Sequence, residues 1–182
     1  MQNDLVQRAK ALAHRAHAGQ VDKAGRPYIE HVARVAEATR NDRRCTNEDC
    51  DGFGEIIHWD SVGCADPSCC SPATSPCPDC DVAEAAAWLH DVLEDCDECF
   101  HEAVFVIGSD VALAVMRLTR CRTVPDDRYY ELIRFNKTAR RVKLADIADN
   151  SSEERLALLD EKTAARLRRK YAKAIAALTG EV

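Results

Sequence analysis

The feature that most constrains the fold is an alanine- and leucine-rich stretch at residues 81–95 that ends in a cluster of ionisable side chains. Alanine and leucine are strong helix formers, so the stretch predicts a helix. Residues four apart share a helix face, which places His90 beside Glu94 and Asp91 beside Asp95. A surface helix spreads its charges, whereas these charges crowd one strip of an otherwise apolar helix. The pattern therefore indicates a functional site.

Two other predicted helices carry side chains that can complete such a site. His31 lies in the first turns of a helix that Pro27 can open, because proline favours the first helical position. Asp146 and Asn150 lie four apart on a later helix. If the three helices pack together, two imidazoles and two carboxylates can surround one divalent cation. The four ligands are then His31, His90, Asp91 and Asp146.

These four donors offer nitrogen and oxygen but no thiolate. Such a set suits Mn²⁺, Fe²⁺ or Mg²⁺ with open water positions, and it can also bind Zn²⁺. The alternative interpretation makes His31 an ordinary helix-face histidine and Asp146 an ion-pair partner of Lys143. That alternative is the better one for any single residue, but the four residues together favour the metal site.

The same residues carry a resemblance to a known family. His31, the pair His90-Asp91 and Asp146, in this order on separate helices, resemble the metal ligands of the HD phosphohydrolase superfamily. Four motifs extend the likeness to the alarmone hydrolase domain of RelA/SpoT proteins and to the stand-alone small alarmone hydrolases. The motifs are His-Ala-Gly-Gln at 17–20, Gly-Arg-Pro-Tyr-Ile-Glu-His at 25–31, His-Asp-Val-Leu-Glu-Asp at 90–95 and Val-Lys-Leu-Ala-Asp at 142–146, followed by Asn150. Residues 41–80 lie outside the likeness.

The resemblance implies a metal-dependent phosphohydrolase that removes pyrophosphate from the 3′ position of guanosine tetra- or pentaphosphate. It implies Mn²⁺ as the expected metal, with Glu94 and Asp95 as the catalytic residues that orient water and handle protons. It also implies that Lys23 and Asn150 contact the nucleotide, whereas Lys143, three residues before Asp146, can either pair with that carboxylate or reach a substrate phosphate.

One position departs from the family pattern and leaves the substrate open. Where an arginine is expected the chain has Asp22, which removes a planar cation that can stack on a base, so the purine preference is not fixed. One alternative is an HD-type phosphohydrolase or nucleotidase acting on another nucleotide or small phosphate ester. A second is a catalytically inactive HD binding protein that recruits a partner through its cysteine-rich segment.

Helical periodicity covers most of the chain and predicts an all-α fold. The expected helices span residues 4–18, 28–39, 81–95, 98–107, 109–118, 125–135, 138–150 and 160–178. No segment shows the alternation expected of a strand. With 182 residues the chain suffices for one well-buried domain. We therefore expect a single HD-type helical bundle over 1–182 with a cysteine-rich loop insertion at 41–80.

The charge and hydropathy of the chain limit the classes of partner that it is expected to bind. The formal net charge is −6 and the acidic excess is diffuse, which argues against nucleic-acid binding. No apolar run approaches the roughly 18 residues that a membrane span needs, and the N-terminus lacks the pattern of a secretory signal. We expect a cytoplasmic protein whose partner is a small nucleotide, with no nucleic acid and no membrane; a homodimer is an open alternative.

Seven of the ten cysteines fall within residues 45–80, where helical periodicity stops. A reducing cytosol disfavours disulfides, so clustered cysteines indicate metal binding. Four ligands from this insertion, among which His58 is also available, can hold a structural Zn²⁺ and order a segment without a core of its own. The thiols considered are those of Cys45, Cys50, Cys64, Cys69, Cys77 and Cys80. The spacing does not decide which four bind, and a flexible, oxidisable loop is the alternative.

Overall fold

A computed structural model of the protein describes residues 4–22, 25–42, 45, 47–48, 50–51, 54–58 and 73–180, with the backbone alone at 57, 58 and 73. Helices make up most of this part of the chain, in agreement with the all-α expectation. They are α1 (Asp4–Ala16), α2 (Tyr28–Arg40), α3 (Pro78–Leu89), α4 (Val92–Asp95), α5 (His101–Ile107), α6 (Ser109–Leu118), α7 (Asp126–Arg134), α8 (Lys137–Asn150), α9 (Glu153–Leu156) and α10 (Glu161–Thr179). A 3₁₀ turn, Glu98–Phe100, precedes α5.

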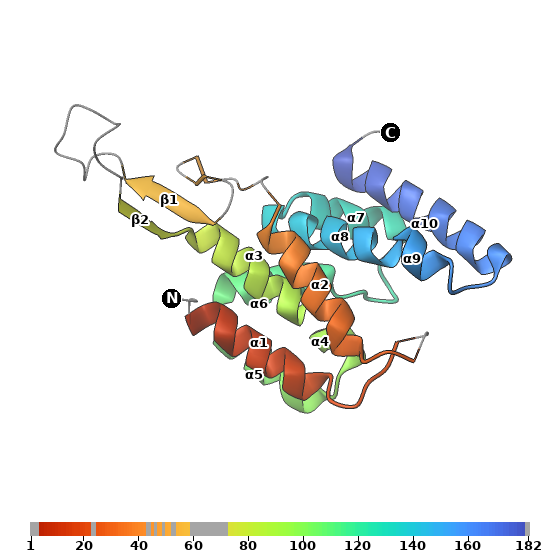
Figure 1. Cartoon of the computed structure of the whole chain (residues 1–182), viewed down its shortest axis with the longest axis horizontal. Helices are drawn as coiled ribbons and strands as arrows, with labels where there is room; N and C mark the ends of the chain where they lie inside the picture. The colour runs from red at the N-terminus through yellow and green to blue at the C-terminus, as the bar shows by residue number, and fades with distance from the viewer. Residues whose placement is uncertain are drawn as a thin grey trace.

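Helix α3 runs through the interior of the bundle (Figure 1). It packs against α1, α2, α6 and α8, and its side chains Ala85, Ala86 and Ala87 are fully buried. Small alanine side chains on every face let four neighbouring helices approach one axis, and the neighbours fill the space between with larger residues such as Leu12 and Val35. Helices α2, α3 and α8 also pack on one another, which is the arrangement that the predicted metal site requires.

The His90-Asp91 dipeptide interrupts the helix predicted over 81–95. Helix α3 begins earlier than expected, with Pro78 at its start, and ends at Leu89. The chain then turns at Asp91, which has φ −104° and ψ −2°, before α4 begins at Val92. The prediction of one continuous helix was wrong here, because local propensity carries no information about the tertiary contacts that turn the chain.

A two-stranded antiparallel sheet lies between α2 and α3 and was not predicted. Strand β1 (Glu55–His58) pairs with β2 (Ala73–Pro76), with Glu55 opposite Pro76. The sheet extends away from the bundle next to the start of α3 (Figure 1). Strands of four residues are too short to reveal an alternating pattern, which is why the sequence predicted a loop.

The C-terminal part of the chain covers the side of the bundle formed by α7 and α8. Helix α10 packs on both, and its N-cap is Asp160, whose carboxylate accepts a hydrogen bond from the backbone N–H of Thr163. The short helix α9, which was not predicted, leads into it. Among the helices of the described ranges, none is both long and apolar enough to cross a membrane.

Candidate metal centre

Three of the four predicted metal ligands converge from three different helices. His31 comes from α2, His90 from the end of α3, and Asp146 from α8, and all three side chains are buried. Their ligand atoms all lie within 4.8 Å of one another. The Nε2 atoms of His31 and His90 lie 3.4 Å and 3.9 Å from Oδ1 of Asp146. The three side chains form a pocket of donors into which a single cation fits.

The fourth predicted ligand, Asp91, borders this group rather than belonging to it. Its Oδ2 atom lies 2.8 Å from Nε2 of His90 and 3.9 Å from Nε2 of His31. The hydroxyl of Tyr28 donates a hydrogen bond to the same oxygen at 2.6 Å. Sequence reasoning missed Tyr28, whose role depends on the close approach of α2 to the turn after α3. Asp91 therefore lies beside both imidazoles, and the hydrogen bond from Tyr28 holds its carboxylate there.

Hydrogen bonds fix which nitrogen of each imidazole faces the centre. Nδ1 of His90 lies 2.8 Å from the carbonyl oxygen of Ala87, and a carbonyl only accepts, so Nδ1 carries the proton. Nε2 of His90 is buried, and its 2.8 Å contact with Oδ2 of Asp91 lacks the geometry of a hydrogen bond. Nδ1 of His31 lies 2.7 Å from Oδ2 of Asp149, so the same assignment holds there. With Nδ1 protonated, each ring turns its Nε2 atom toward the carboxylates of Asp91 and Asp146, and a cation bound there would take the place of an Nε2 proton, so the residues fit a divalent cation.

Asp149 supports the centre from behind His31, and sequence reasoning missed it. Its carboxylate accepts hydrogen bonds from Nε of Arg34 at 2.6 Å and from Nη1 of Arg155 at 3.1 Å, in addition to the His31 ring. Burial raises the pKa of Asp149, but the hydrogen bonds from His31 and Arg34 outweigh it and hold the pKa well below its usual range. The available signal was its spacing of three residues from Asp146 on the same helix face.

The electrostatics of the centre attract positive charge. Burial by itself lowers the pKa of His90, but the charges of Asp91 and Asp146 outweigh it and raise the pKa to about 9. Burial raises the pKa of Asp91, but the neighbouring His90 lowers it to about 2. The carboxylates therefore stay ionised, and a proton or a metal ion is needed at the imidazoles to balance them.

Lys143 and Asn150, predicted to contact a nucleotide, both bond to Asp146. Nζ of Lys143 donates to Oδ2 at 2.8 Å, and Nδ2 of Asn150 donates to Oδ1 at 2.5 Å. Burial lowers the pKa of Lys143, but the charge of Asp146 dominates and raises it above its ordinary value. The ion pair that the sequence offered as an alternative is thus present. It orients the carboxylate beside the two imidazoles without taking Asp146 out of the group.

The two predicted catalytic carboxylates point in different directions. Oε2 of Glu94 accepts a hydrogen bond at 2.9 Å from the backbone N–H of Arg120, which anchors it to the loop after α6. Oδ2 of Asp95 lies 3.5 Å from the Tyr28 hydroxyl, on the side of Asp91. Burial and the nearby Asp91 raise the pKa of Asp95. Of the pair, Asp95 is the one positioned to exchange a proton next to the metal centre.

The motif at residues 17–20 also reaches this region. Nε2 of Gln20 donates to the carbonyl oxygen of Asp95 at 2.9 Å, and its Oε1 lies 2.8 Å from Nδ1 of His17. The backbone carbonyl of Gln20 accepts from the N–H of Tyr28 at 2.9 Å. Gln20 therefore ties α4 to the start of α2 and fixes the distance between Asp95 and Tyr28.

A cavity of about 380 Å³ opens beside the centre. Tyr28, Asp95 and Asn150 form the wall that it shares with the metal site. The remaining wall combines polar and apolar side chains from the loop before α2 and from the segment 155–171, namely Val21, Asp22, Arg26, Arg155, Leu158, Leu159, Leu167 and Tyr171. This volume lies within the usual range for small-molecule sites.

Other predicted site residues fall in two groups. Lys23, Cys64 and Cys69 lie outside the described residues, so their predicted roles stay predictions. Cys45, Cys50, Cys77 and Cys80 come together as a second group of possible ligands, which shares no residue with the first. No protein-family model matches the chain, and a search of curated proteins also finds no match. The interpretation of the centre therefore depends on its own geometry.

Proposed function

We propose that the chain is a metal-dependent phosphohydrolase of the HD type that removes the 3′-pyrophosphate from guanosine tetra- or pentaphosphate or a related nucleotide. The observation that carries the proposal is the pair of buried imidazoles whose Nε2 atoms both face the carboxylate of Asp146. The Nε2 atom of His90 is buried and makes no hydrogen bond of good geometry within the described residues, which is costly unless a cation satisfies it.

His31, His90 and Asp146, with Asp91 at their edge, would hold the cation. When bound, a divalent ion supplies Lewis-acid polarisation of a phosphoryl oxygen and lowers the pKa of water. The donors are nitrogen and oxygen only, which favours Mn²⁺, Fe²⁺ or Mg²⁺ over the softer metals that prefer thiolates. We expect Mn²⁺ to support activity.

Asp95 is the residue that we assign to proton transfer. Its raised pKa lets it bind and release a proton closer to neutral pH than a fully solvated aspartate, as general acid–base catalysis requires. It lines the cavity, and Tyr28 lies between it and Asp91. Glu94 is held by the backbone of Arg120, so we assign it a positioning role for the turn that carries Asp95.

The cavity offers a suitable environment for a nucleotide. Leu158, Leu159 and Tyr171 supply an apolar surface for a base, and Arg26 and Arg155 supply positive charge for phosphates. Arg155 lies 3.6 Å from Asp22, the position where the resembled family has an arginine. In this chain an arginine from α9 thus approaches the loop before α2, and we propose that it takes over part of the missing residue's role.

Product analysis of the Mn²⁺-loaded protein tests the proposal. Guanosine tetraphosphate, its adenosine counterpart and a nucleoside monophosphate are offered side by side. Pyrophosphate release from either 3′-pyrophosphorylated nucleotide is the expected result, and it decides the purine preference. Orthophosphate from the monophosphate alone would instead make the protein a general nucleotidase.

Two variants show whether the centre is responsible for any turnover. Asp146→Asn removes a charge from the proposed ligand set and should abolish hydrolysis. Asp127→Asn makes the same chemical change at an exposed position in the first turn of α7 and should leave hydrolysis intact. Equal activity of both variants would contradict the assignment, and no turnover by the metal-loaded wild-type protein would favour the binding-protein alternative.

A further inference from the structure

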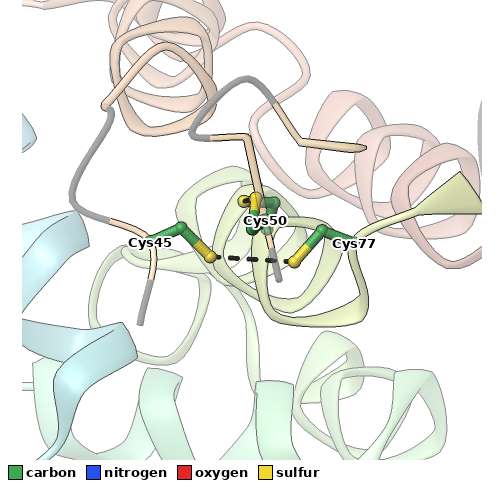
Figure 2. A group of neighbouring side chains, drawn as sticks. Cys45, Cys50 and Cys77 are labelled. Carbon is green, nitrogen blue, oxygen red and sulfur yellow. Dashed lines mark hydrogen bonds between the residues drawn. The ribbon is translucent and has the colours of Figure 1, made fainter. Parts of the chain in front are cut away.

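Four cysteine thiols gather where the chain leaves α2 and enters α3. Cys45 and Cys50 follow α2 in the sequence, whereas Cys77 and Cys80 come after both strands of the sheet, at the start of α3. Figure 2 shows the sulfur atoms of Cys45 and Cys77 pointing toward one another, with Cys50 beside them. All four sulfur atoms lie within 4.8 Å of one another.

We propose that Cys45, Cys50, Cys77 and Cys80 bind a structural Zn²⁺ that fastens both ends of the insertion to the helical bundle. This site is separate from the proposed phosphohydrolase centre, and its existence does not depend on that activity. The choice of ligands settles a question that the cysteine spacing alone left open.

The distances between the sulfur atoms match a tetrahedral zinc site. Cys45 and Cys77 have their Sγ atoms 3.7 Å apart, and Cys50 and Cys80 have theirs 3.9 Å apart. A tetrahedron with Zn–S bonds of about 2.3 Å has S···S edges of about 3.8 Å. A disulfide would need the sulfur atoms about 2.05 Å apart, and none of the described cysteines is in a disulfide.

The start of α3 is built to accept a thiolate. Cys77 occupies the N-cap position and Pro78 follows it. The first backbone N–H groups of α3, those of Asp79 and Cys80, have no partner within the helix, and together with the helix dipole they favour negative charge on a nearby sulfur. The backbone N–H of Cys77 donates to the carbonyl of Gly54 at 2.7 Å, which joins the knuckle to the segment before β1.

A buried arginine supplies the charge that such a site needs. Four thiolates around Zn²⁺ carry a net charge of about −2, which is unfavourable in a buried position without a nearby cation. Arg141 on α8 is buried, and its Nη1 atom lies 3.6 Å from Sγ of Cys80. Its Nη2 atom donates to the carbonyl of Asp42 at 2.6 Å, in the segment that leads to Cys45. Arg141 therefore contacts one proposed ligand, Cys80, and the backbone of the segment that leads to another.

The test uses the full chain and measures zinc released from thiolates. The purified protein is treated with an organomercurial, which displaces metal only from sulfur, and the freed zinc is read with a chromogenic chelator. We expect about one zinc per chain. The Asp146→Asn variant should release the same amount, which separates this site from the centre at His31.

Serine substitutions identify the ligands. Cys77→Ser and Cys80→Ser should lose the mercurial-released zinc. Cys121→Ser, at an exposed cysteine outside the insertion, should keep it. Cys64→Ser and Cys69→Ser, which the proposal leaves out of the ligand set, should also keep it, and loss of zinc in either would overturn the assignment.

A measurement on the wild-type protein guards against variants that fail to fold. Co²⁺ added to zinc-free protein should produce the strong visible absorption of tetrahedral cobalt thiolate, saturate at about one equivalent per chain and disappear when Zn²⁺ is added. The absence of this absorption from protein with a native circular dichroism spectrum would refute the proposal. So would non-reducing mass spectrometry that finds the four cysteines paired as disulfides in freshly purified protein.

Discussion

The substitution Asp149→Asn probes how the centre fixes the chemistry of His31. Both carboxylate oxygens of Asp149 are used: Oδ1 accepts from Nε of Arg34, and Oδ2 accepts from Nδ1 of His31 and from Arg155. Asparagine has one oxygen and one NH₂ group in the same space, so its NH₂ must face a donor on one side. If it faces Arg34, two donors and a positive charge meet without an acceptor. If it faces His31, the imidazole proton moves to Nε2 and blocks the lone pair that binds the metal.

Either orientation weakens metal binding, and the size of the expected loss of affinity can be bounded. Loss of an outer-shell partner of a metal-ligating histidine typically costs about 10- to 100-fold in affinity, which corresponds to about 1.4 to 2.8 kcal/mol. We expect the upper part of this range, because the His31 ring is buried and no water can replace the lost acceptor.

Calorimetric titration with Mn²⁺ measures this loss directly. Asp127→Asn is the matched control, since it makes the same change on an exposed helix turn. Arg155→Gln is a second control, because it removes one neighbour of Asp149 but leaves the carboxylate to accept from His31. Mn²⁺ affinity of Asp149→Asn within about twofold of wild type would refute the reasoning. Thermal unfolding of the metal-free proteins shows whether any loss reflects the centre or a loosened fold.

Three further predictions follow from the fold and the centre. In metal-free protein the pKa of His90 is raised to about 9, so the ring is protonated at pH 7 and Mn²⁺ must displace that proton. Calorimetry in buffers of different ionisation enthalpy should therefore find about one proton released per Mn²⁺ ion bound at pH 7. The affinity for Mn²⁺ should rise with pH up to about 9. Asp95→Asn should reduce kcat by about 100-fold or more, as loss of a general acid–base group does, with Mn²⁺ affinity nearly unchanged; a parallel loss of affinity would make Asp95 a ligand instead. Ala86→Leu, in a fully buried position on α3, should lower the free energy of unfolding by about 1–3 kcal/mol in a urea titration, and a change below about 0.5 kcal/mol would mean that α3 is packed less tightly than described.

The sequence predicted His31, His90 and Asp146 as ligands on the condition that their helices pack together, and on the resemblance to the HD superfamily, but it did not predict how the helices are rotated. The structure brings these three side chains together. The separation of roles between Asp146 and Asp149 was not predictable. Both lie on the same face of α8, and only the rotation of α8 against α2 decides that the first faces the Nε2 side of His31 and the second its Nδ1 side.

The same limit explains the remaining differences. The helix predicted through His90 ends at Leu89, and the hydrogen bond from Tyr28 on α2 holds Asp91 in the turn that follows, a tertiary contact that the sequence does not reveal. Among the cysteines, spacing could not choose a ligand set. The grouping of Cys45 and Cys50 with Cys77 and Cys80 follows from the packing of α2 on α3. This packing brings the end of the insertion back beside its beginning.

The two metal groups are connected through helices α3 and α8, which sets how one can affect the other. Cys80 and His90 lie ten residues apart on α3 and the turn after it, or about 15 Å along a helix axis at about 1.5 Å per residue. The side chains concerned are buried, and salt screens buried charges much less than exposed ones, so a direct electrostatic influence can act over this distance. A rotation of α3, which alanine side chains hold tightly against four neighbours, would also move His90 with Cys80. Mn²⁺ titration of Cys77→Ser alongside hydrogen exchange of α3 distinguishes the two routes: a change in Mn²⁺ affinity with faster exchange of α3 indicates mechanical coupling, a change with unaltered exchange indicates electrostatic coupling, and unaltered affinity means that the two sites are independent.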